Sequence, residues 1–470
     1  MSTQATRRRF PTWLRRLGWL SLVCLALLFC LSATYSWLGW QARQTVQRAR
    51  AALPKPALPS PRTAPSPTDA IPVKELPGLG PLLTRDPSGA ELRALIDRLR
   101  GLGFWLMGER ASFRTFLAKL GLEGVNAIPE EELAATVLSK LAEFQPLLEA
   151  WQAAVSAGRW GNSQDTTVGV CLHPEQQLAD AIAGLLELKA RAQWATGDAT
   201  GAWSTVEWLA LTAQRSLDAT RPWGGNATGQ LTDTLRHGLA SGALSDEQLR
   251  EIPSLVARLD PLSHLPALAD ASPSIRSEAI RFADEHPATG PPSRTSWDSD
   301  NLLGSMASAL GTLLDTPGRR DASFELWSAI EQAGAASIDY GTRTVLPADQ
   351  RAALDPTTQI GSDWFSQFYY GPTLMYGEMM PDLVWAPVQA QIQFDHVGIA
   401  AGLELEKRTT GHYPASLPAG VPHDISTGAP YGYQLTPDGG YKLWSSGKNQ
   451  VDDGGNPASD FVWQPESRVK

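Results

Sequence analysis

Cysteine is scarce in this sequence, with three residues among 470. Cys24 and Cys30 lie inside an apolar run near the N-terminus, so the rest of the chain contains only Cys171. A single cysteine cannot form an internal disulfide, so a fold outside the cytoplasm would depend on apolar packing or on a metal ion. The scarcity of cysteine therefore excludes a disulfide-stapled fold.

The sequence also lacks the motifs whose spacing carries a catalytic mechanism. It has no Gly-x-Ser-x-Gly nucleophile elbow, no phosphate-binding or dinucleotide-binding glycine loop, no His-Glu-x-x-His and no paired Cys-x-x-Cys. We therefore expect a protein that is not an enzyme. The alternative is an enzyme whose site is built from dispersed residues between the helical body and the C-terminal head that are identified below.

Acidic residues are absent from residues 1–62, which contain ten Arg or Lys. Because the formal charge of the whole chain is −9, the remaining 408 residues carry −19. Such an acidic bulk repels phosphate backbones and excludes nucleic acid as a partner. Hydrophobic residues make up 43% and charged residues 19%, which excludes wholesale disorder.

An uncharged run extends from Leu17 to Ala42. As a helix it is long enough to cross a hydrocarbon layer of about 30 Å, and it predicts a transmembrane anchor over residues 17–42. The alternative is a cleaved signal peptide, which usually has a shorter apolar run followed by a small-x-small cleavage site. Tryptophans near the two ends favour a membrane-spanning helix, because an indole ring suits the membrane interface: Trp13, Trp19, Trp37 and Trp40.

Basic residues lie on both sides of this run, with a slight excess on the N-terminal side. The excess favours a basic cytoplasmic tail over residues 1–16. We therefore expect a single-pass protein of a bacterial inner membrane, with a cytoplasmic N-terminus and a periplasmic bulk. Its expected partners are the membrane and an envelope or secretion-system protein.

Ten prolines lie between Pro54 and Pro87. Such a segment is neither helix nor sheet, and in polyproline II geometry it is a semi-rigid rod. The sequence predicts a proline-rich spacer over residues 43–85.

Helical periodicity follows over residues 86–385, for which we predict an all-α body. Pro129 followed by three glutamates is typical of a helix start. Gly197-Asp198 separates two apolar stripes and predicts an antiparallel helix pair, with Leu178, Ile182 and Leu185 on the first helix and Ala202, Val206, Leu209 and Ala213 on the second. Further helices are expected at residues 92–102, 229–242, 245–259 with Ser245 as N-cap, 272–285, 301–315 and 321–334.

The last part of the chain, residues 386–470, differs in kind. A helix-compatible stretch over residues 389–407 leads into turn-rich sequence. Tyr431 and Tyr433 alternate before a Pro-Asp-Gly-Gly turn, and Tyr441, Leu443 and Ser445 alternate after it. This pattern predicts a β-hairpin or a short antiparallel sheet within a small α+β module.

The stretch from Gly447 to Asp460 combines acids with glycines. It is either a solvated turn or a hard-cation site, because calcium takes six to eight oxygen ligands and needs a backbone that can turn its carbonyls inward. The candidate metal ligands are Asn449, Asp452, Asp453 and Asp460.

The module resembles the C-terminal head of the major pseudopilin of type II secretion systems. The resemblance rests on Gly411, Tyr413 and Pro414; on Asp424, Gly428, Pro430, Tyr431 and Tyr433; and on Leu443, Ser445, Gly447, Asp460 and Trp463. It implies a calcium ion held by two aspartates and main-chain carbonyls. The second aspartate falls on Asp460 and the first on Asn449, a neutral ligand, for which Asp452 or Asp453 could substitute.

No prepilin signature opens the membrane segment, so the chain is not expected to be a pilin subunit. The layout is similar to that of membrane-anchored proteins of planctomycetes and verrucomicrobia that end in such a head, a resemblance that implies no activity. The sequence therefore predicts a mainly α protein: a transmembrane helix, an all-α array and a small pseudopilin-like α+β module with a calcium-stabilised head.

Overall fold

The computed structural model of the chain describes residues 12–53, 130–156, 174–218, 225–265, 317–359 and 380–464. These residues form two compact units, of which the first consists of residues 12–53, 317–330 and 355–359 and the second of the others. Over the described ranges the protein is mostly helical, with two small antiparallel sheets of two and three strands. This confirms the predicted mainly α fold with a small sheet.

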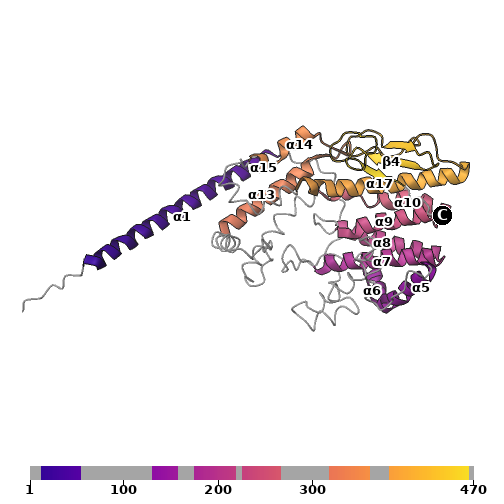
Figure 1. Cartoon of the computed structure of the whole chain (residues 1–470), viewed down its shortest axis with the longest axis horizontal. Helices are drawn as coiled ribbons and strands as arrows, with labels where there is room; N and C mark the ends of the chain where they lie inside the picture. The colour runs from indigo at the N-terminus through magenta and orange to yellow at the C-terminus, as the bar shows by residue number, and fades with distance from the viewer. Residues whose placement is uncertain are drawn as a thin grey trace, which may run out of the picture. The chain divides into compact units, whose positions relative to one another are not determined.

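Helix α1 (Thr12–Ala52) dominates the first unit as a continuous helix of 41 residues (Figure 1). It contains the predicted anchor run. Counting only residues that the structure describes, none of the helices combines the length and the apolar character needed to cross a bilayer. The side chains of residues 12–28, in the first half of α1, are not among those described. The anchor stays a prediction.

The C-terminal end of α1 corrects the boundary of the predicted spacer. The sequence predicts a spacer that begins at residue 43, but residues 43–52 continue the helix. They contain no proline and are rich in Gln, Arg and Ala, which are good helix formers, and the helix ends just before Pro54. The rest of the spacer and the helices expected at residues 92–102, 272–285 and 301–315 lie outside the described residues.

The first unit also contains most of α13 (Pro317–Ala336) and the short α15 (Pro356–Gln359). Helix α13 confirms the helix expected at residues 321–334. Val46 of α1 and Leu326 of α13 are fully buried, and the Gln47 amide donates a hydrogen bond of 3.3 Å to the Glu325 carboxylate.

The second unit is built on a stack of antiparallel helices, which lie one beside the next in Figure 1. The helices are α5 (Glu130–Leu141), α6 (Gln145–Ser156), α7 (Pro174–Ala195), α8 (Ala199–Asp218), α9 (Gly225–Ser241) and α10 (Asp246–Ala257), with short 3-10 turns η4 (Ala142–Phe144) and η5 (Pro261–His264). The helix start at Glu130 and the helices predicted around residues 178–185, 202–213, 229–242 and 245–259 are confirmed.

The α7–α8 hairpin follows from two adjacent residues. Gly197 has a φ of +80°, a conformation that residues with a side chain rarely adopt, and it reverses the chain. Asp198 then caps α8, because its Oδ1 accepts the Gly201 amide at 2.9 Å while its Oδ2 accepts Gln193 Nε2 at 3.0 Å. The predicted turn is therefore both a chain reversal and a helix cap.

Helix α10 starts with a complete capping box. Ser245 Oγ accepts the Gln248 amide at 3.2 Å, and the Gln248 side chain accepts the Ser245 amide at 2.9 Å. Asp246 and Glu247 in the first turn add favourable charge at the positive end of the helix dipole. The predicted N-cap is confirmed.

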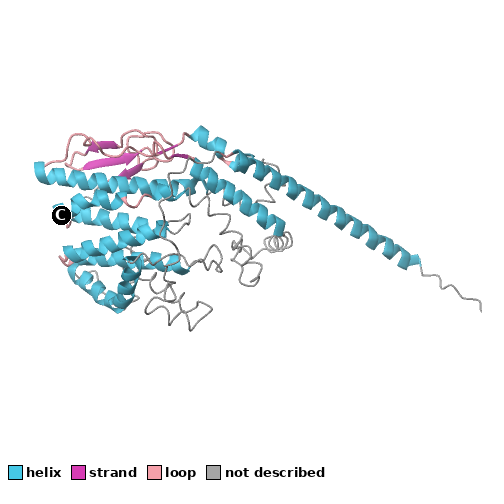
Figure 2. Ribbon diagram, turned by 180° about the vertical axis from the view of Figure 1, so that it is seen from behind, coloured by secondary structure: helices cyan, strands magenta, loops and turns pink. Residues whose placement is uncertain are grey.

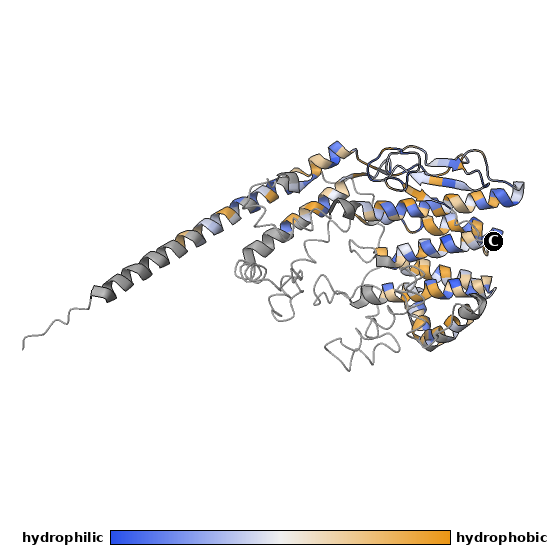
Figure 3. Ribbon diagram, viewed as in Figure 1, coloured by the Kyte–Doolittle hydropathy of each residue, from blue (hydrophilic) through white to orange (hydrophobic). Residues whose placement is uncertain are grey.

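The core of the stack is apolar and closely packed. Ile182, Leu185, Val206, Leu209 and Leu231 are fully buried. Figure 3 shows both hydrophobic and hydrophilic positions on each of these helices, as expected of amphipathic helices that bury one stripe. Buried alanines on α7 and α8 allow the two helices to approach closely: Ala179, Ala181, Ala183, Ala190, Ala202, Ala210 and Ala213.

Helix α17 (Met380–Thr410) joins this stack to the C-terminal strands. It packs on α9 and α10, and it also contacts β4 and β5 of the three-stranded antiparallel sheet, which appears next to it in Figure 2. The sheet has the order β3 (Gly432–Leu435), β4 (Tyr441–Ser445), β5 (Phe461–Trp463), and the predicted hairpin is β3–β4. A second hairpin, β1 (Ile338–Asp339) with β2 (Thr344–Val345), precedes the helix α14 (Ala348–Leu354).

The expected boundary between body and head, at residues 385/386, lies inside α17. One hydrophobic core extends from Leu141 of α5 through α7–α10 and α17 to Trp463 of β5. The helical stack and the C-terminal sheet are therefore parts of a single compact unit.

Candidate functional site

The predicted cation loop connects β4 to β5, and each of its candidate ligands has an intramolecular partner. Asn449 Nδ2 donates a hydrogen bond of 2.8 Å to Asp453 Oδ2. Hydrogen bonds from Ser459 and Asn449 hold the pKa of the exposed Asp453 below its ordinary value. Asp452 Oδ1 accepts the Trp444 indole N–H at 2.8 Å and the Gly454 amide at 2.9 Å.

Asp460 is the buried member of the set, with 5% of its surface exposed. Its Oδ2 accepts the amides of Gly455 and Asn456 at 2.7 and 3.0 Å, so the carboxylate closes the turn that precedes β5. Its Oδ1 is buried without a hydrogen-bond donor.

The structure pairs Asn449 with Asp453 but does not bring all four side chains together. Over the described ranges, no group of three or more His, Cys, Asp or Glu side chains is placed to hold a metal ion. The carbonyls of Gly454 and Gly455, which a calcium ion could use, accept hydrogen bonds from Lys442 Nζ at 2.8 and 3.3 Å. In this arrangement the loop does not offer the shell of six to eight oxygens that calcium requires.

Asp424, one of the residues that carry the pseudopilin resemblance, organises the head. It is almost fully buried, and its two oxygens accept four hydrogen bonds, from the Ser426 amide and hydroxyl, the Ser445 hydroxyl and the Ser446 amide, at 2.7–2.9 Å. A buried carboxylate is stable only when its oxygens are satisfied in this way. Asp424 therefore fixes the turn after it to the end of β4.

Gln450 joins the loop to the first hairpin, a role that no sequence signal indicated. Its Nε2 donates to the Ser426 carbonyl at 2.7 Å and lies 3.3 Å from the carbonyls of Val345 and Leu346. Its Oε1 accepts a guanidinium N–H of Arg351 at 3.3 Å. Gln450 adopts a φ of +58°, and these bonds hold the residue in that uncommon conformation.

A buried acid lies where α17 meets the head. Asp395 accepts the Tyr431 hydroxyl at 2.7 Å and the Gln391 amide at 2.8 Å. Burial raises the pKa of Asp395 to about 6, against the opposing effect of these hydrogen bonds and of the nearby Arg343 guanidinium. Arg343 in turn forms a bidentate ion pair with Asp260 at 2.9 and 3.0 Å.

A perturbed acid of this kind is a candidate general base. Both oxygens of Asp395 are nevertheless engaged, and neither of the hollows described below is lined by it. The adjacent His396 is buried, and burial lowers its pKa to about 3, so it is neutral at physiological pH. It stacks edge-on against Tyr431 and Trp463, as a packing residue does. We assign this cluster a structural role.

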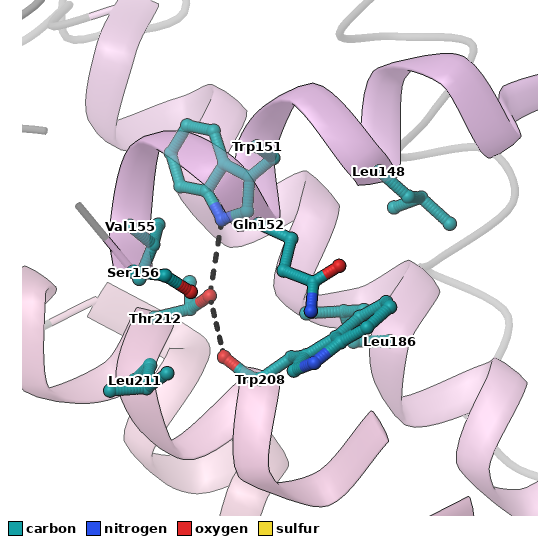
Figure 4. A pocket seen from close by; sticks show the side chains of 9 residues that line it. All are labelled: Leu148, Trp151, Gln152, Val155, Ser156, Leu186, Trp208, Leu211 and Thr212. Carbon is teal, nitrogen blue, oxygen red and sulfur yellow. Dashed lines mark hydrogen bonds between the residues drawn. The ribbon is translucent and has the colours of Figure 1, made fainter. Parts of the chain in front are cut away.

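Figure 4 shows a small cavity among α6, α7 and α8. The Trp151 indole N–H donates to Thr212 Oγ1 at 3.1 Å, and that hydroxyl donates to the Trp208 carbonyl at 2.9 Å. The cavity has room for about 10 Å³, which is too little for more than one water molecule. It is a packing defect rather than a ligand site.

A larger groove of about 500 Å³ opens between α8 and α10. Trp203 and Leu255 supply its apolar surface, and the Trp203 indole N–H donates to the Glu251 carboxylate at 3.1 Å. Glu207 and Glu251 give the groove two carboxylates against the single guanidinium of Arg258. An acidic groove of this composition suits an apolar segment with a positive charge. Sequence reasoning missed it, because its residues come from two helices and carry no motif.

No protein-family model matches the chain, and the comparisons found neither a curated protein nor a solved structure that is detectably similar to it.

Proposed function

We propose that this chain is a membrane-anchored, non-catalytic protein of the bacterial envelope whose compact helical unit binds another envelope protein. The observation that carries the proposal is the acidic groove between α8 and α10. The function needs neither a catalytic residue nor calcium. The proposed occupant is a protein segment with an apolar side chain next to a lysine or arginine.

The membrane part of the proposal rests on the sequence and on the described part of α1. The 26 uncharged residues from Leu17 to Ala42 are long enough to span a bilayer. Phe29, Trp37 and Trp40 each expose more than half of their surface. Trp37 and Trp40 are three residues apart and lie on one side of the helix, where indole rings could sit in a membrane interface. The proposed orientation places the N-terminus in the cytoplasm and the second unit in the periplasm.

The groove part rests on shape and charge. Trp203 and Leu255 form the apolar part of the lining, and with 9% and 5% of their surface exposed they give a partner a small apolar contact. Two carboxylates against one guanidinium favour a cationic partner, and the charge of −19 on residues 63–470 would attract such a partner over a longer range. At about 500 Å³, the groove accepts one or two side chains of a partner segment.

The test is site-specific crosslinking in the native membrane. A photoreactive amino acid at Ser254, inside the groove, should give a discrete crosslinked product. Glu207→Lys should reduce its yield roughly tenfold, because charge reversal at a rim position costs about 1–2 kcal/mol of binding. Peptide mapping should place the crosslink beside a lysine or arginine of the partner.

The matched control is Asp349→Lys, which makes the same charge change on α14 at an exposed position outside the groove. It should leave the yield unchanged. Equal losses with Glu207→Lys and Asp349→Lys would reject the groove as the binding site, and so would a crosslink to lipid alone. Recovery of the chain in the soluble fraction after alkaline extraction would reject the anchor.

A further inference from the structure

Lys442 on β4 reaches over the end of the acidic loop. Its Nζ donates hydrogen bonds to the carbonyl oxygens of Gly454 and Gly455, at 2.8 and 3.3 Å. The same nitrogen lies 5.0 Å from the ring centroid of Trp444, the next residue but one along the strand, which is within the range of a cation–π contact. A single ammonium group thus meets two carbonyls and an aromatic face.

Trp444 is itself held in place. Its indole N–H donates to Asp452 Oδ1 at 2.8 Å, so an acid of the loop anchors the ring on which the ammonium rests. Gly432, the cross-strand partner of Trp444 on β3, provides the room for that ring, because a Cβ at this position would overlap the indole. The arrangement therefore depends on three segments: β3, β4 and the loop between β4 and β5.

Gly455 leaves room for the lysine in the same way. A Cβ on Gly455 would lie 2.7 Å from Lys442 Cε and 2.8 Å from its Nζ, closer than real Cβ atoms approach. Gly455 also has a φ of +72°. The missing side chain makes room for the lysine, and the positive φ lets the carbonyl face the Lys442 amine. The backbone amide of Gly455 donates to Asp460 Oδ2 at 2.7 Å. One glycine joins the lysine to the buried carboxylate that closes the turn.

The loop carries three carboxylates within nine residues, Asp452, Asp453 and Asp460, so a positive charge close to it is electrostatically favourable. The pseudopilin resemblance implies calcium as this charge. Here the expected first ligand is Asn449, bound to Asp453, and the loop carbonyls are bound by Lys442.

We propose that the ammonium group of Lys442 takes the place of the calcium ion: it gathers the carbonyls of Gly454 and Gly455 and fixes the loop over residues 447–460 without a metal. The head then keeps its structure whatever the calcium concentration around it. Removing the ammonium leaves two carbonyls and the unpartnered Asp460 Oδ1 available to an added cation, so the variant, unlike the wild type, responds to calcium.

The test is hydrogen exchange, read by mass spectrometry, on the full-length protein in detergent with millimolar calcium or with a chelator. In the wild type, the amides of residues 447–460 should exchange equally in both conditions. Lys442→Met retains an unbranched side chain over Trp444 but removes the ammonium. It should accelerate exchange of this segment roughly tenfold in chelator, as expected for the loss of charge-assisted hydrogen bonds, and calcium should restore part of the protection.

Lys189→Met is the matched control, because the Lys189 ammonium also lies over a tryptophan ring, 5.2 Å from the Trp208 centroid, but belongs to α7 of the helical stack. It should leave exchange of the loop unchanged. Protection of the wild-type loop by calcium would overturn the proposal, and this outcome needs no variant to fold. Unchanged exchange in Lys442→Met would also overturn it. Neither result bears on the groove between α8 and α10, so this proposal and the proposed function can fail separately.

Discussion

The helical stack α7–α9 and the C-terminal head belong to one compact unit but use their polar groups differently. In the stack, most buried hydroxyls donate within their own helix: Thr212 donates to the Trp208 carbonyl and Thr234 to the Gln230 carbonyl, each four residues back. Thr205 of α8, which also donates to Gln193 of α7 at 2.7 Å, joins only neighbouring helices. In the head, polar side chains join distant segments. Asp424 reaches Ser445, and Gln450 reaches Val345, 105 residues away in sequence.

This difference indicates that the two regions are stabilised by different kinds of interaction. The stack depends on many interchangeable apolar contacts, each worth a modest amount. The head has a small sheet and short strands, so a few specific hydrogen bonds determine its conformation. Mutations in the stack should therefore act through lost volume, and mutations in the head through a single lost group.

The largest expected effect is in the stack. Leu185 is fully buried, so Leu185→Ala should destabilise the second unit by about 4 kcal/mol through lost burial and a residual cavity. Because one core joins the stack to the head, hydrogen exchange should accelerate both in α7–α9 and in β3–β5. Glu207→Ala, at an exposed position of α8, is the control and should change neither. Acceleration confined to the stack would show that the two regions unfold separately.

The next effect is in the head. Asp424→Ala leaves two buried serine hydroxyls and two amides without their acceptor, and it should destabilise the head by about 3 kcal/mol. Exchange should accelerate in residues 424–446, while α7–α9 stay protected. Asp424→Asn retains one carbonyl acceptor and should give an intermediate result. If exchange in α7–α9 rises as much as in the head, the stack also depends on the hydrogen bonds of Asp424, and the proposed difference between the two regions is wrong.

The third prediction concerns pH and compares one buried acid from each region. Burial raises the pKa of Asp395 from 3.8 to about 6. Burial also raises the pKa of Glu187, in the stack, from 4.5 to about 7, although the nearby Arg191 guanidinium lowers it. The folded state therefore binds each proton more tightly than the unfolded state does. The resulting stabilisation is fully present below the unfolded pKa and is lost as pH rises through the folded pKa.

We expect each acid to contribute on the order of 2 kcal/mol at acidic pH that is absent above its folded pKa. Asp395→Asn should remove the part of the pH dependence that ends near pH 6, and Glu187→Gln the part that ends near pH 7. Thermal unfolding of the full-length protein across this range measures both. The sign is read from the difference between wild type and variant, because the lowered pKa of the buried His396 makes the stability of all of them rise with pH over the same range. A stability advantage of the wild type over either variant that grows between pH 4 and pH 7 would contradict the predicted sign.

The smallest effect compares two neighbouring glycines of the loop. Gly454 and Gly455 both have φ near +70°, so replacing either with Ala costs about 1 kcal/mol of backbone strain. Only at Gly455 would the new Cβ collide with Lys442, whereas nothing lies within 4 Å of it at Gly454. Gly455→Ala should therefore accelerate exchange of residues 447–460 more than Gly454→Ala does. Equal effects would show that the lysine can move aside without loss.

Much of the fold could be predicted from local patterns. The apolar stripes of α7 and α8, the turn at Gly197-Asp198 and the cap at Ser245 are local features, so the sequence shows them directly. The short antiparallel sheet of the head was among the predicted alternatives, but the sequence did not locate its third strand β5 or the short β1–β2 hairpin. Their strands have two or three residues, too few for an alternation to be recognised.

The candidate site could be predicted only as a loop with acids and glycines. The composition of residues 447–460 favoured a positive charge close to the loop, but did not indicate its source. Lys442 was missed because it lies on the preceding strand, and a lysine in an alternating pattern looks like an ordinary solvent-facing position. The groove between α8 and α10 was missed because its two walls are some 50 residues apart in sequence.

The stacking of Arg236 on Trp463 has a consequence for how the chain is made. The guanidinium carbon of Arg236, in α9, lies 4.5 Å from the ring centroid of Trp463, in β5. The core to which both regions contribute therefore cannot close until residue 463 has been synthesised. Contacts so distant in sequence slow folding and leave apolar helix faces exposed while the rest of the chain is made. If the unit folds in the periplasm, it would cross the membrane unfolded, and a chain truncated before β5 would be a substrate for proteases.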